Sequence, residues 1–247
     1  ISFQINAKEK NLSFQDEKKF SYASINKFQT LIALCNDNNK ISILDGLTFD
    51  CLNIFKFENS TKQALFHPIY DYLIVMMSID KINIIDPYNL QESQTSCFFE
   101  LAEHRPLWMS LSYGGNKLAV VWKHFNKETT IGGSVTKIII YDLPKDLKFD
   151  KKNQIEIDIT PKSYKMITPS NKEISFVNVL FDLSGEYIYI TDENNQIQYF
   201  DINNNNILNI SSKLFNKSLN SITFSPKFEF ILASGNEGVK VLDPLTF

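Results

Sequence analysis

One short motif occurs near both ends of the sequence, as Ile43-Leu44-Asp45-Gly46-Leu47-Thr48-Phe49 and as Val241-Leu242-Asp243-Pro244-Leu245-Thr246-Phe247. In each copy a β-branched or aliphatic run ends in an aspartate, and residues typical of a turn follow it. Shorter versions of the motif occur at three further places: Ile84-Ile85-Asp86-Pro87-Tyr88-Asn89-Leu90, Ile140-Tyr141-Asp142-Leu143-Pro144 and Tyr199-Phe200-Asp201-Ile202-Asn203. The sequence is therefore built from a repeated unit in which a strand leads into a turn.

The spacing of the five aspartates gives the length of this unit. Asp45 and Asp86 are 41 residues apart, and Asp201 and Asp243 are 42 apart, while Asp142 lies 56 residues after Asp86 and 59 before Asp201. Repeats of about 40–45 residues are typical of β-propeller blades. A second landmark precedes three of the aspartates by a nearly constant distance, as Phe66-His67-Pro68, Phe181-Asp182-Leu183 and Phe224-Ser225-Pro226.

The runs between these landmarks predict strands that are buried on both faces. Residues 72–77 and 187–190 are continuous and rich in aliphatic and aromatic side chains, as expected where neighbouring sheets cover a strand on both sides. Segments rich in Asn, Asp and Gly separate strand-like runs at 36–39, 192–195 and 234–238 and are typical of hairpin turns. No segment has a sustained period of 3.6 residues, so we expect little helix.

These features predict an all-β propeller that forms a single domain over residues 1–247. We expect five blade-like units, at about residues 21–56, 60–98, 104–165, 174–212 and 218–247. Seven blades are the commoner number. Either the chain supplies part of a seven-bladed ring whose other blades lie outside these residues, or the ring is small or open.

The third unit is the longest, and its extra residues predict a projecting loop. They extend from Trp122 to Ser134, and a second polar insertion covers residues 145–153. Loops carry binding residues more often than the scaffold does, and tryptophan is enriched in interface hot spots. We therefore take Trp108, Trp122 and Phe125 as candidate partner contacts, with burial in the core as the alternative for the two tryptophans.

The composition limits the classes of partner. The formal net charge is −3 and the pI is about 5.7, which provides no broad positive field for strong, direct binding to nucleic acid. No apolar run approaches the roughly 20 residues needed to cross a bilayer, so we expect no membrane contact. Cys35, Cys51 and Cys97 are too few and too dispersed for a disulfide framework. We therefore expect a reducing compartment, the cytoplasm.

No group of residues predicts a catalytic, cofactor or metal site. His67, His104 and His124 lack metal-ligand spacing, and the sequence has no nucleophile elbow, Walker loop or dinucleotide-binding glycine pattern. The repeated aspartates could suggest a carboxylate site, but each occupies the same position of a different unit. We interpret them as structural acids that stabilise turns through side-chain hydrogen bonds: Asp45, Asp86, Asp142, Asp201 and Asp243.

The repeats resemble those of the WD40 family. Tyr141-Asp142, Phe200-Asp201 and Leu242-Asp243 stand where that family has the Trp-Asp pair that closes a blade, and no Gly-His pair opens one. The resemblance implies a diverged WD40-like propeller that binds other proteins.

Within that family, residues 104–247 resemble the i subunits of eukaryotic translation initiation factor three. The resemblance is carried by three segments: residues 115–142, which contain Gly115-Asn116-Lys117-Leu118-Ala119-Val120-Val121, Gly133-Ser134 and Ile138-Ile139-Ile140-Tyr141-Asp142; residues 185–201; and Ser221-Ile222-Thr223-Phe224-Ser225-Pro226. It implies a non-catalytic subunit that binds the b and g subunits of that factor and, through them, the small ribosomal subunit.

The leading hypothesis is therefore a non-catalytic scaffold of translation initiation that holds peptide segments of partner subunits. An adaptor in another cytoplasmic or nuclear complex is an alternative that the repeats support equally well. A propeller hydrolase with its site in the central channel is a third alternative. Clustered carboxylates around a bound metal in the channel would support it.

Overall fold

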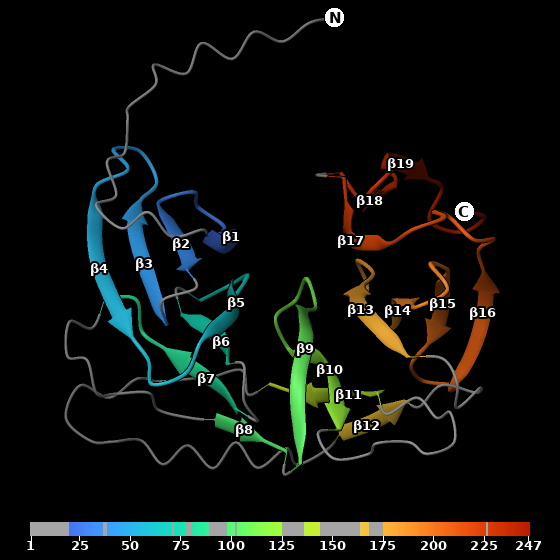
Figure 1. Cartoon of the computed structure of the whole chain (residues 1–247), viewed down its shortest axis with the longest axis horizontal. Helices are drawn as coiled ribbons and strands as arrows, with labels where there is room; N and C mark the ends of the chain where they lie inside the picture. The colour runs from blue at the N-terminus through green and yellow to red at the C-terminus, as the bar shows by residue number, and fades with distance from the viewer. Residues whose placement is uncertain are drawn as a thin grey trace, which may run out of the picture.

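The computed structural model describes residues 20–36, 39–70, 72–77, 81–88, 98–101, 103–124, 136–143, 164–167, 175–225 and 227–247. The regular elements in these residues are all β-strands, which form five antiparallel sheets. The sheets lie side by side around a common axis in an open ring (Figure 1). The described residues form an all-β propeller of five blades, which confirms the predicted fold class.

The strands of each sheet follow one another in chain order. The first four sheets have four strands each and the fifth has three. The first two sheets consist of β1 (Phe20–Ile25), β2 (Leu31–Asn36), β3 (Lys40–Asp45) and β4 (Cys51–Lys56), and of β5 (Thr61–Phe66), β6 (Leu73–Met77), β7 (Lys81–Ile85) and β8 (Phe98–Glu100). The third and fourth consist of β9 (His104–Leu111), β10 (Lys117–His124), β11 (Thr136–Asp142) and β12 (Tyr164–Ile167), and of β13 (Phe176–Phe181), β14 (Tyr187–Asp192), β15 (Ile197–Asp201) and β16 (Asn206–Ile210). The fifth consists of β17 (Leu219–Phe224), β18 (Ile231–Gly235) and β19 (Gly238–Leu242).

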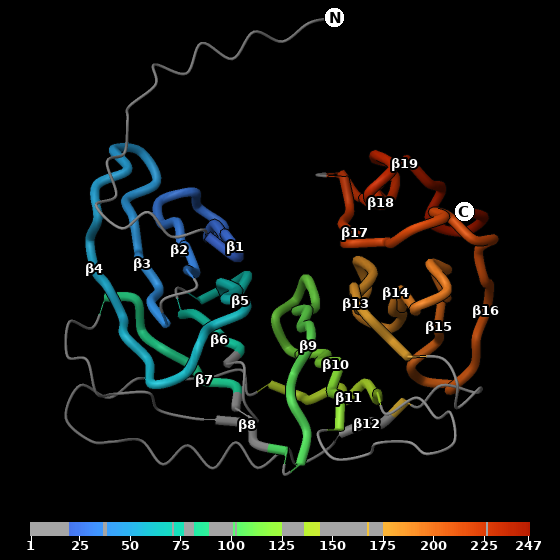
Figure 2. Tube along the Cα trace, viewed as in Figure 1, coloured from blue at the N-terminus to red at the C-terminus, as the bar shows by residue number. Residues whose placement is uncertain are grey.

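The chain passes once around the ring, from the first sheet to the fifth (Figure 2). The first strand of each sheet, namely β1, β5, β9, β13 or β17, lies nearest the axis and contacts the first strand of the next sheet. The described parts of the first and fifth sheets lie on either side of the opening in the ring (Figure 2). In the described residues no helix is long and apolar enough to cross a bilayer.

The apolar core lies between the sheets, in four clusters that each join two neighbouring sheets. Strand β10 shows how the sequence produces this arrangement. Its Leu118, Val120 and Trp122 pack on the second sheet, whereas Ala119 and Val121 pack on the fourth. Successive side chains of a strand point to opposite faces, so a continuous apolar run is the pattern of a strand covered on both sides.

The structure corrects the placement of Trp122. The sequence predicted that a projecting loop begins at this residue, but β10 continues to His124, and Trp122 pairs with Pro106 on β9 and with Lys137 on β11. Its side chain is completely buried. The prediction that Trp122 contacts a partner is therefore wrong, and the alternative of a core tryptophan holds. Phe125 and the polar insertion at 145–153 lie outside the described residues.

Two sets of turns lie at the same end of the strands in every sheet, and we call this end of the propeller the turn face. One set joins the first strand to the second, and the other follows the third strand. The opposite end carries the turns between second and third strands and the connections between sheets, and we call it the connector face. Hydrogen bonds join first strands of successive sheets at corresponding positions along the strands. The five sheets are therefore oriented alike, with the same end of each sheet at the same face of the propeller.

The repeated aspartates begin the turns that follow the third strands. Asp45 Oδ1 accepts hydrogen bonds from the backbone N–H groups of Leu47 and Thr48, at 2.8 and 2.7 Å, and Asp243 Oδ1 accepts the equivalent pair from Leu245 and Thr246, at 2.9 Å each. The hydrogen bond from Thr48 and then that from Leu47 lower the pKa of the Asp45 carboxyl, and those from Leu245 and then Thr246 lower the pKa of the Asp243 carboxyl. Carboxylates that stabilise their own turns in this way are spread around the ring instead of meeting in one site.

Hydrogen bonds of the same kind occur in the second and fourth sheets. Asp86 accepts one from the backbone N–H of Tyr88 at 2.9 Å, and Asp201 accepts one from the backbone N–H of Asn204, also at 2.9 Å. Asp142 ends β11 at the same position, and the residues after Leu143 lie outside the described part of the chain.

Candidate functional site

A cavity of about 530 Å³ lies on the propeller axis, and all five first strands contribute to its wall. Its lining includes Tyr22 of β1, Leu65 of β5, Trp108 of β9, Leu180 of β13 and Phe224 of β17. The cavity extends to the turn face, because residues of four first-to-second turns also line it: Pro68, Ser112, Tyr113, Asp182, Ser225 and Phe228. We call the part formed by these turns the channel mouth.

Side-chain-to-backbone hydrogen bonds hold the first strands together around this cavity. The Gln63 amide group joins β5 to β9 by donating to Met109 O at 3.1 Å and accepting from Met109 N at 3.0 Å. The Asn178 Nδ2 group joins β13 to β17 by donating to Asn220 O at 3.1 Å. Gln63 and Asn178 each lie three residues before the phenylalanine that begins the landmark segment, so the repeat places the same link in two sheets.

Serines make the two remaining links. The Phe66 backbone N–H donates to Ser24 Oγ across β1 and β5, at 3.3 Å, and the Phe181 N–H donates to Ser110 Oγ across β9 and β13, at 3.4 Å. Every pair of neighbouring first strands is therefore joined by at least one polar link. These links keep the cavity wall rigid, which favours binding because a preorganised surface loses less entropy when a ligand binds.

A second set of links joins neighbouring sheets at the turn face. The backbone N–H groups of Ile69 and Tyr70 donate to His67 Nδ1, so the proton of the neutral ring lies on Nε2, which donates to Gly115 O at 2.8 Å. Lys117 Nζ donates to Gly185 O of the next sheet at 2.9 Å. Burial lowers the pKa of His67, and the Gly115 carbonyl opposes this shift.

The residue that begins each first-to-second turn accepts hydrogen bonds from that turn. Side-chain atoms of five different residues do this: Asn26, His67, Ser112, Asp182 and Ser225. Sequence analysis found three of them as landmarks but missed Asn26 and Ser112. The residue type varies from Asn to His, Ser and Asp, so the shared acceptor role was not visible as a sequence motif.

Aromatic side chains contact one another across the cavity, between sheets that are not neighbours in the ring. Tyr22 of the first sheet meets Trp108 of the third at 6.2 Å between ring centroids, edge to face. Tyr113 of the third sheet meets Phe228 of the fifth at 5.4 Å, with the rings at 88°. Phe224 lies 5.2 Å from Phe228. In an edge-to-face pair, the ring that turns its edge toward the other keeps both of its own faces clear of that partner.

The Tyr22–Trp108 pair lies between this cavity and a second one. The second cavity, also about 530 Å³, is lined by both of these rings together with residues nearer the connector face: Ser21, Ser60, Thr61, Lys62, Gln63, Met76 and Leu107. Trp108, which we predicted as a partner contact, thus lines both cavities and is half-buried.

Exposed apolar side chains gather on the turn face. Tyr113, exposed by 57 %, belongs to the channel mouth, and Leu183, exposed by 52 %, follows Asp182 of the mouth. Other exposed apolar side chains on turns of this face are Phe28, Leu47, Phe49, Ile69, Tyr70, Tyr88 and Leu245. Exposed apolar side chains that gather on one face are typical of a site that binds protein.

Titratable side chains do not form a catalytic or metal-binding group in the described residues. No three His, Cys, Asp or Glu side chains there are arranged to hold a metal ion. His124 Nε2 lies 3.2 Å from Glu103 Oε2, and the His124 ring contacts that of His104 at 4.7 Å, on the connector face. Burial raises the pKa of the Cys35 thiol to about 12, so this thiol stays protonated and is a poor nucleophile.

Sequence reasoning missed Tyr113 and Phe228, which form the channel mouth. Both follow the end of a first strand, Tyr113 by one residue after Ser112 and Phe228 by three after Ser225. Gly115 and Gly185 occupy the position of Phe228 in the third and fourth sheets, all with positive φ, at 70° and 72° against 59° for Phe228. A bulky residue at a turn position that two of its sister repeats fill with glycine is a signal that the sequence does offer.

Comparison with known proteins identifies the architecture and no relative. No family model matches the sequence, and no curated protein matches it. Among solved structures, the chain is similar to the β-propeller domain of Cps50 (Swd1) from Myceliophteria thermophila, with a TM-score of 0.64 and 13 % identity over 91 % of this chain and 70 % of that one. The fold is a WD40-like β-propeller. Because 1589 chains of solved structures match, the fold by itself does not select a function.

Proposed function

We propose that this propeller is a non-catalytic docking scaffold that binds a peptide segment of a partner protein at the channel mouth. The observation that carries the proposal is the aromatic surface of Tyr113, Phe224 and Phe228, which lies over a preformed cavity in a wall linked by hydrogen bonds. Exposed aromatic rings on rigid elements supply buried area at low entropic cost, which is why they dominate interface hot spots.

The test is to pan a display library of random dodecapeptides on the immobilised chain. Selected peptides are then measured against two charge-introducing variants, Tyr113→Asp at the channel mouth and Ile54→Asp on the outer strand β4. Both side chains are exposed, at 57 % and 42 %, so neither substitution buries a charge. We expect Tyr113→Asp to abolish binding and Ile54→Asp to leave it unchanged. Failure to enrich any peptide, or binding that survives Tyr113→Asp, would refute the proposal.

The finer assignment is that the partners belong to translation initiation factor three. It is supported by the similarity of residues 115–142, 185–201 and 221–226 to the i subunits of that factor. The chain would then act in the cytoplasm, contacting the b and g subunits and, through them, the small ribosomal subunit. Mixing the purified chain with the b and g subunits should give a complex on size exclusion that Tyr113→Asp disrupts. Absence of a complex with either subunit would favour an adaptor role in a different assembly.

A hydrolase role receives no support from the channel. Asp182 contributes the one charged side chain among the residues that line the axial cavity, and both of its oxygens accept hydrogen bonds within its own turn. Acid–base catalysis needs a proton donor or acceptor free to reach a substrate. Asp182 is instead a structural acceptor in the described part of the chain.

A further inference from the structure

The charges of the described residues differ between the two ends of the propeller. The turn face carries mainly carboxylates: Asp45, Asp50, Asp86, Asp142, Asp182, Glu186, Asp201, Glu229 and Asp243, against Lys27, Lys117 and Lys227. The connector face carries mainly cations: Lys40, Lys56, Lys62, Arg105, Lys123, Lys137, Lys213 and Lys217, against Glu58, Glu103, Asp192, Glu193 and Glu237. The described residues therefore give the propeller an acidic end and a basic end.

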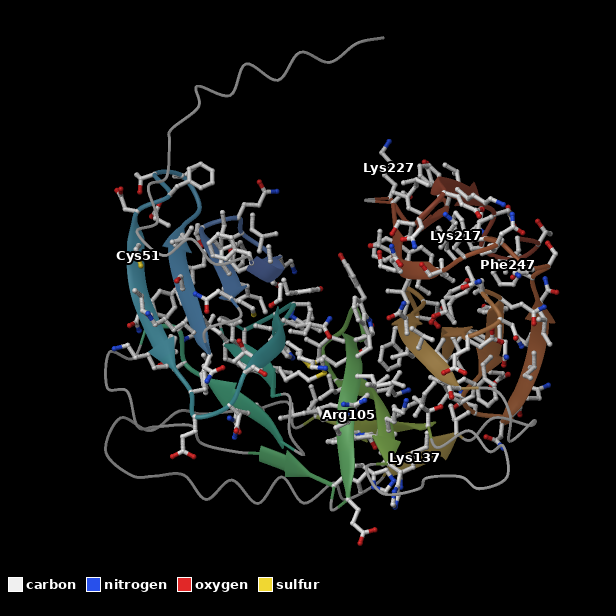
Figure 3. All side chains as sticks on the ribbon, in the orientation of Figure 1. Cys51, Arg105, Lys137, Lys217, Lys227 and Phe247 are labelled. Atoms are coloured by element: carbon white, nitrogen blue, oxygen red, sulfur yellow. The ribbon has the colours of Figure 1, made fainter. Side chains whose placement is uncertain are left out.

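The charges at the channel mouth have the same sign as the turn face. Among the described residues, no Lys or Arg lines the axial cavity. Of the three lysines on this face, Lys117 is bonded to Gly185 O, and the Lys227 side chain extends away from the centre of the ring (Figure 3). Burial first, and then the negative charge of Asp182, raise the pKa of the Tyr199 phenol, which shows that this carboxylate acts on its surroundings.

The aromatic rings at the mouth suit a cation. Tyr113 and Phe228 stand at 88° to each other, with Phe224 at 44° to Phe228, and Ser112 and Ser225 belong to the same lining. A guanidinium or ammonium group within about 6 Å of a ring face is attracted by the ring quadrupole. The aliphatic stem of such a side chain fits an apolar wall while its charged head reaches acceptors.

We propose that the channel mouth recognises a single lysine or arginine side chain of the docked segment. This inference rests on the proposed function and names the chemistry of the partner. The basic head lies against the rings of Tyr113 and Phe228 in the field of the surrounding carboxylates, and the flanking peptide lies across the acidic turn face. A segment with an acidic anchor would meet like charge there and is excluded by it.

The backbone of Phe228 makes a clean test possible. Its φ of 59° lies in the left-handed region, which glycine adopts without strain, so Phe228→Gly removes the ring and suits the turn. Phe49 offers a matched control, because it is also a phenylalanine in a turn of the turn face with a φ of 62° but is absent from the cavity lining. Phe49→Gly makes the same chemical change away from the mouth.

The experiment resynthesises the dodecapeptides selected on the wild-type chain, each with its basic residue intact and with arginine replaced by citrulline or lysine by norleucine. We expect the selected peptides to share one lysine or arginine. We expect its neutral replacement, or Phe228→Gly, to lower affinity by about three- to thirtyfold, and the two changes together to cost no more than either alone. Phe49→Gly should leave affinity unchanged.

Three results would overturn the inference. Peptides that depend on Tyr113 but lack a basic anchor would leave the docking proposal standing and remove this one. Equal losses in Phe49→Gly and Phe228→Gly would mean that strain relief, not the ring, changes binding. A dimer of the chain in solution that buries Phe228 would identify a second copy as the occupant. Enrichment of no peptide at all would refute the docking proposal itself, so the two failures are distinguishable.

Discussion

The third and fifth sheets share the order of their first three strands but differ in what covers them. In the third sheet, β10 and β11 are buried on both faces between the second and fourth sheets. In the fifth sheet, Val239 and Val241 of β19 are exposed by 65 % and 63 %. This difference shows that the burial of a strand in a propeller depends on the sheets that flank it. The third sheet should therefore hold the fold together, while the fifth is free to serve binding.

The largest expected effect comes from emptying the interface of the second and third sheets. Trp122→Ala removes a wholly buried side chain from that cluster and should lower the free energy of unfolding by about 3–5 kcal/mol. Val241→Ala on the exposed β19 should change it by about 0.5 kcal/mol or less. Urea denaturation followed by circular dichroism measures both. Similar losses for the two variants would mean that the third sheet is not the better supported one.

The glycine of the third sheet's first turn provides the next test. A Cβ at Gly115 would clash with the His67 ring, and the φ of Gly115 is positive, so Gly115→Ala should cost about 2–4 kcal/mol. Gly185→Ala shares the positive φ, but its Cβ would meet only Ser112 Cβ at 3.4 Å. It should cost roughly 1 kcal/mol, the backbone contribution alone. If the two variants unfold at the same denaturant concentration, the contact with His67 is not what constrains Gly115.

Lowering the pH should weaken the link that His67 makes with Gly115 between the second and third sheets. Burial keeps the pKa of His67 below its ordinary value of 6.5, and the two N–H groups that point at Nδ1 exclude a second proton. The neutral ring is therefore favoured in the folded state, and stability should fall as the pH drops below 6.5 toward the folded-state pKa. His67→Asn is the control, because Asn26 begins the equivalent turn of the first sheet. Thermal unfolding of the variant should lose this part of the pH dependence, and an unchanged profile would contradict the assignment.

The smallest effect is expected at the exposed turn acid of the fifth sheet. Backbone hydrogen bonds lower the pKa of Asp243, so its carboxylate stabilises the fold above pH 3.8, and that contribution disappears as the pH falls through the folded-state value. Asp243→Asn should lower the thermal midpoint slightly at pH 7. The difference from the wild type should vanish in strong acid. If the thermal midpoints of the variant and the wild type differ by the same amount at every pH, the substitution acts through side-chain geometry and not through the lost charge.

The fold could be predicted because a local sequence pattern specifies each blade, and this pattern recurs along the chain. Asp45 and Asp243 end strands in the same motif, and the uninterrupted runs of β6 and β14 signal cover on both sides. The boundary at Trp122 was predicted wrongly because the irregular spacing of the third unit was read as a loop. The alternating contacts of β10, which extend it to His124, depend on the sheets on either side and not on the strand itself.

The candidate site could be predicted only in part, for a geometrical reason. Trp108 was a candidate and lines the axial cavity. Its partner Tyr22 is about two sheets away in the chain, as Phe228 is from Tyr113. Such contacts arise from the curvature of the ring, which sequence spacing does not encode. The left-handed position that Phe228 shares with Gly115 and Gly185 was the available clue, and it becomes visible once the turns are aligned.

Amide hydrogen exchange of the chain with and without a selected dodecapeptide tests the central claim most directly. If the channel mouth is the docking site, the peptide should slow exchange in the turns at residues 112–117 and 225–230 and leave the outer strands β4 and β16 unchanged. Slower exchange confined to β4 or β16, with both turns unaffected, would show that partners bind the rim of a blade and would contradict the account.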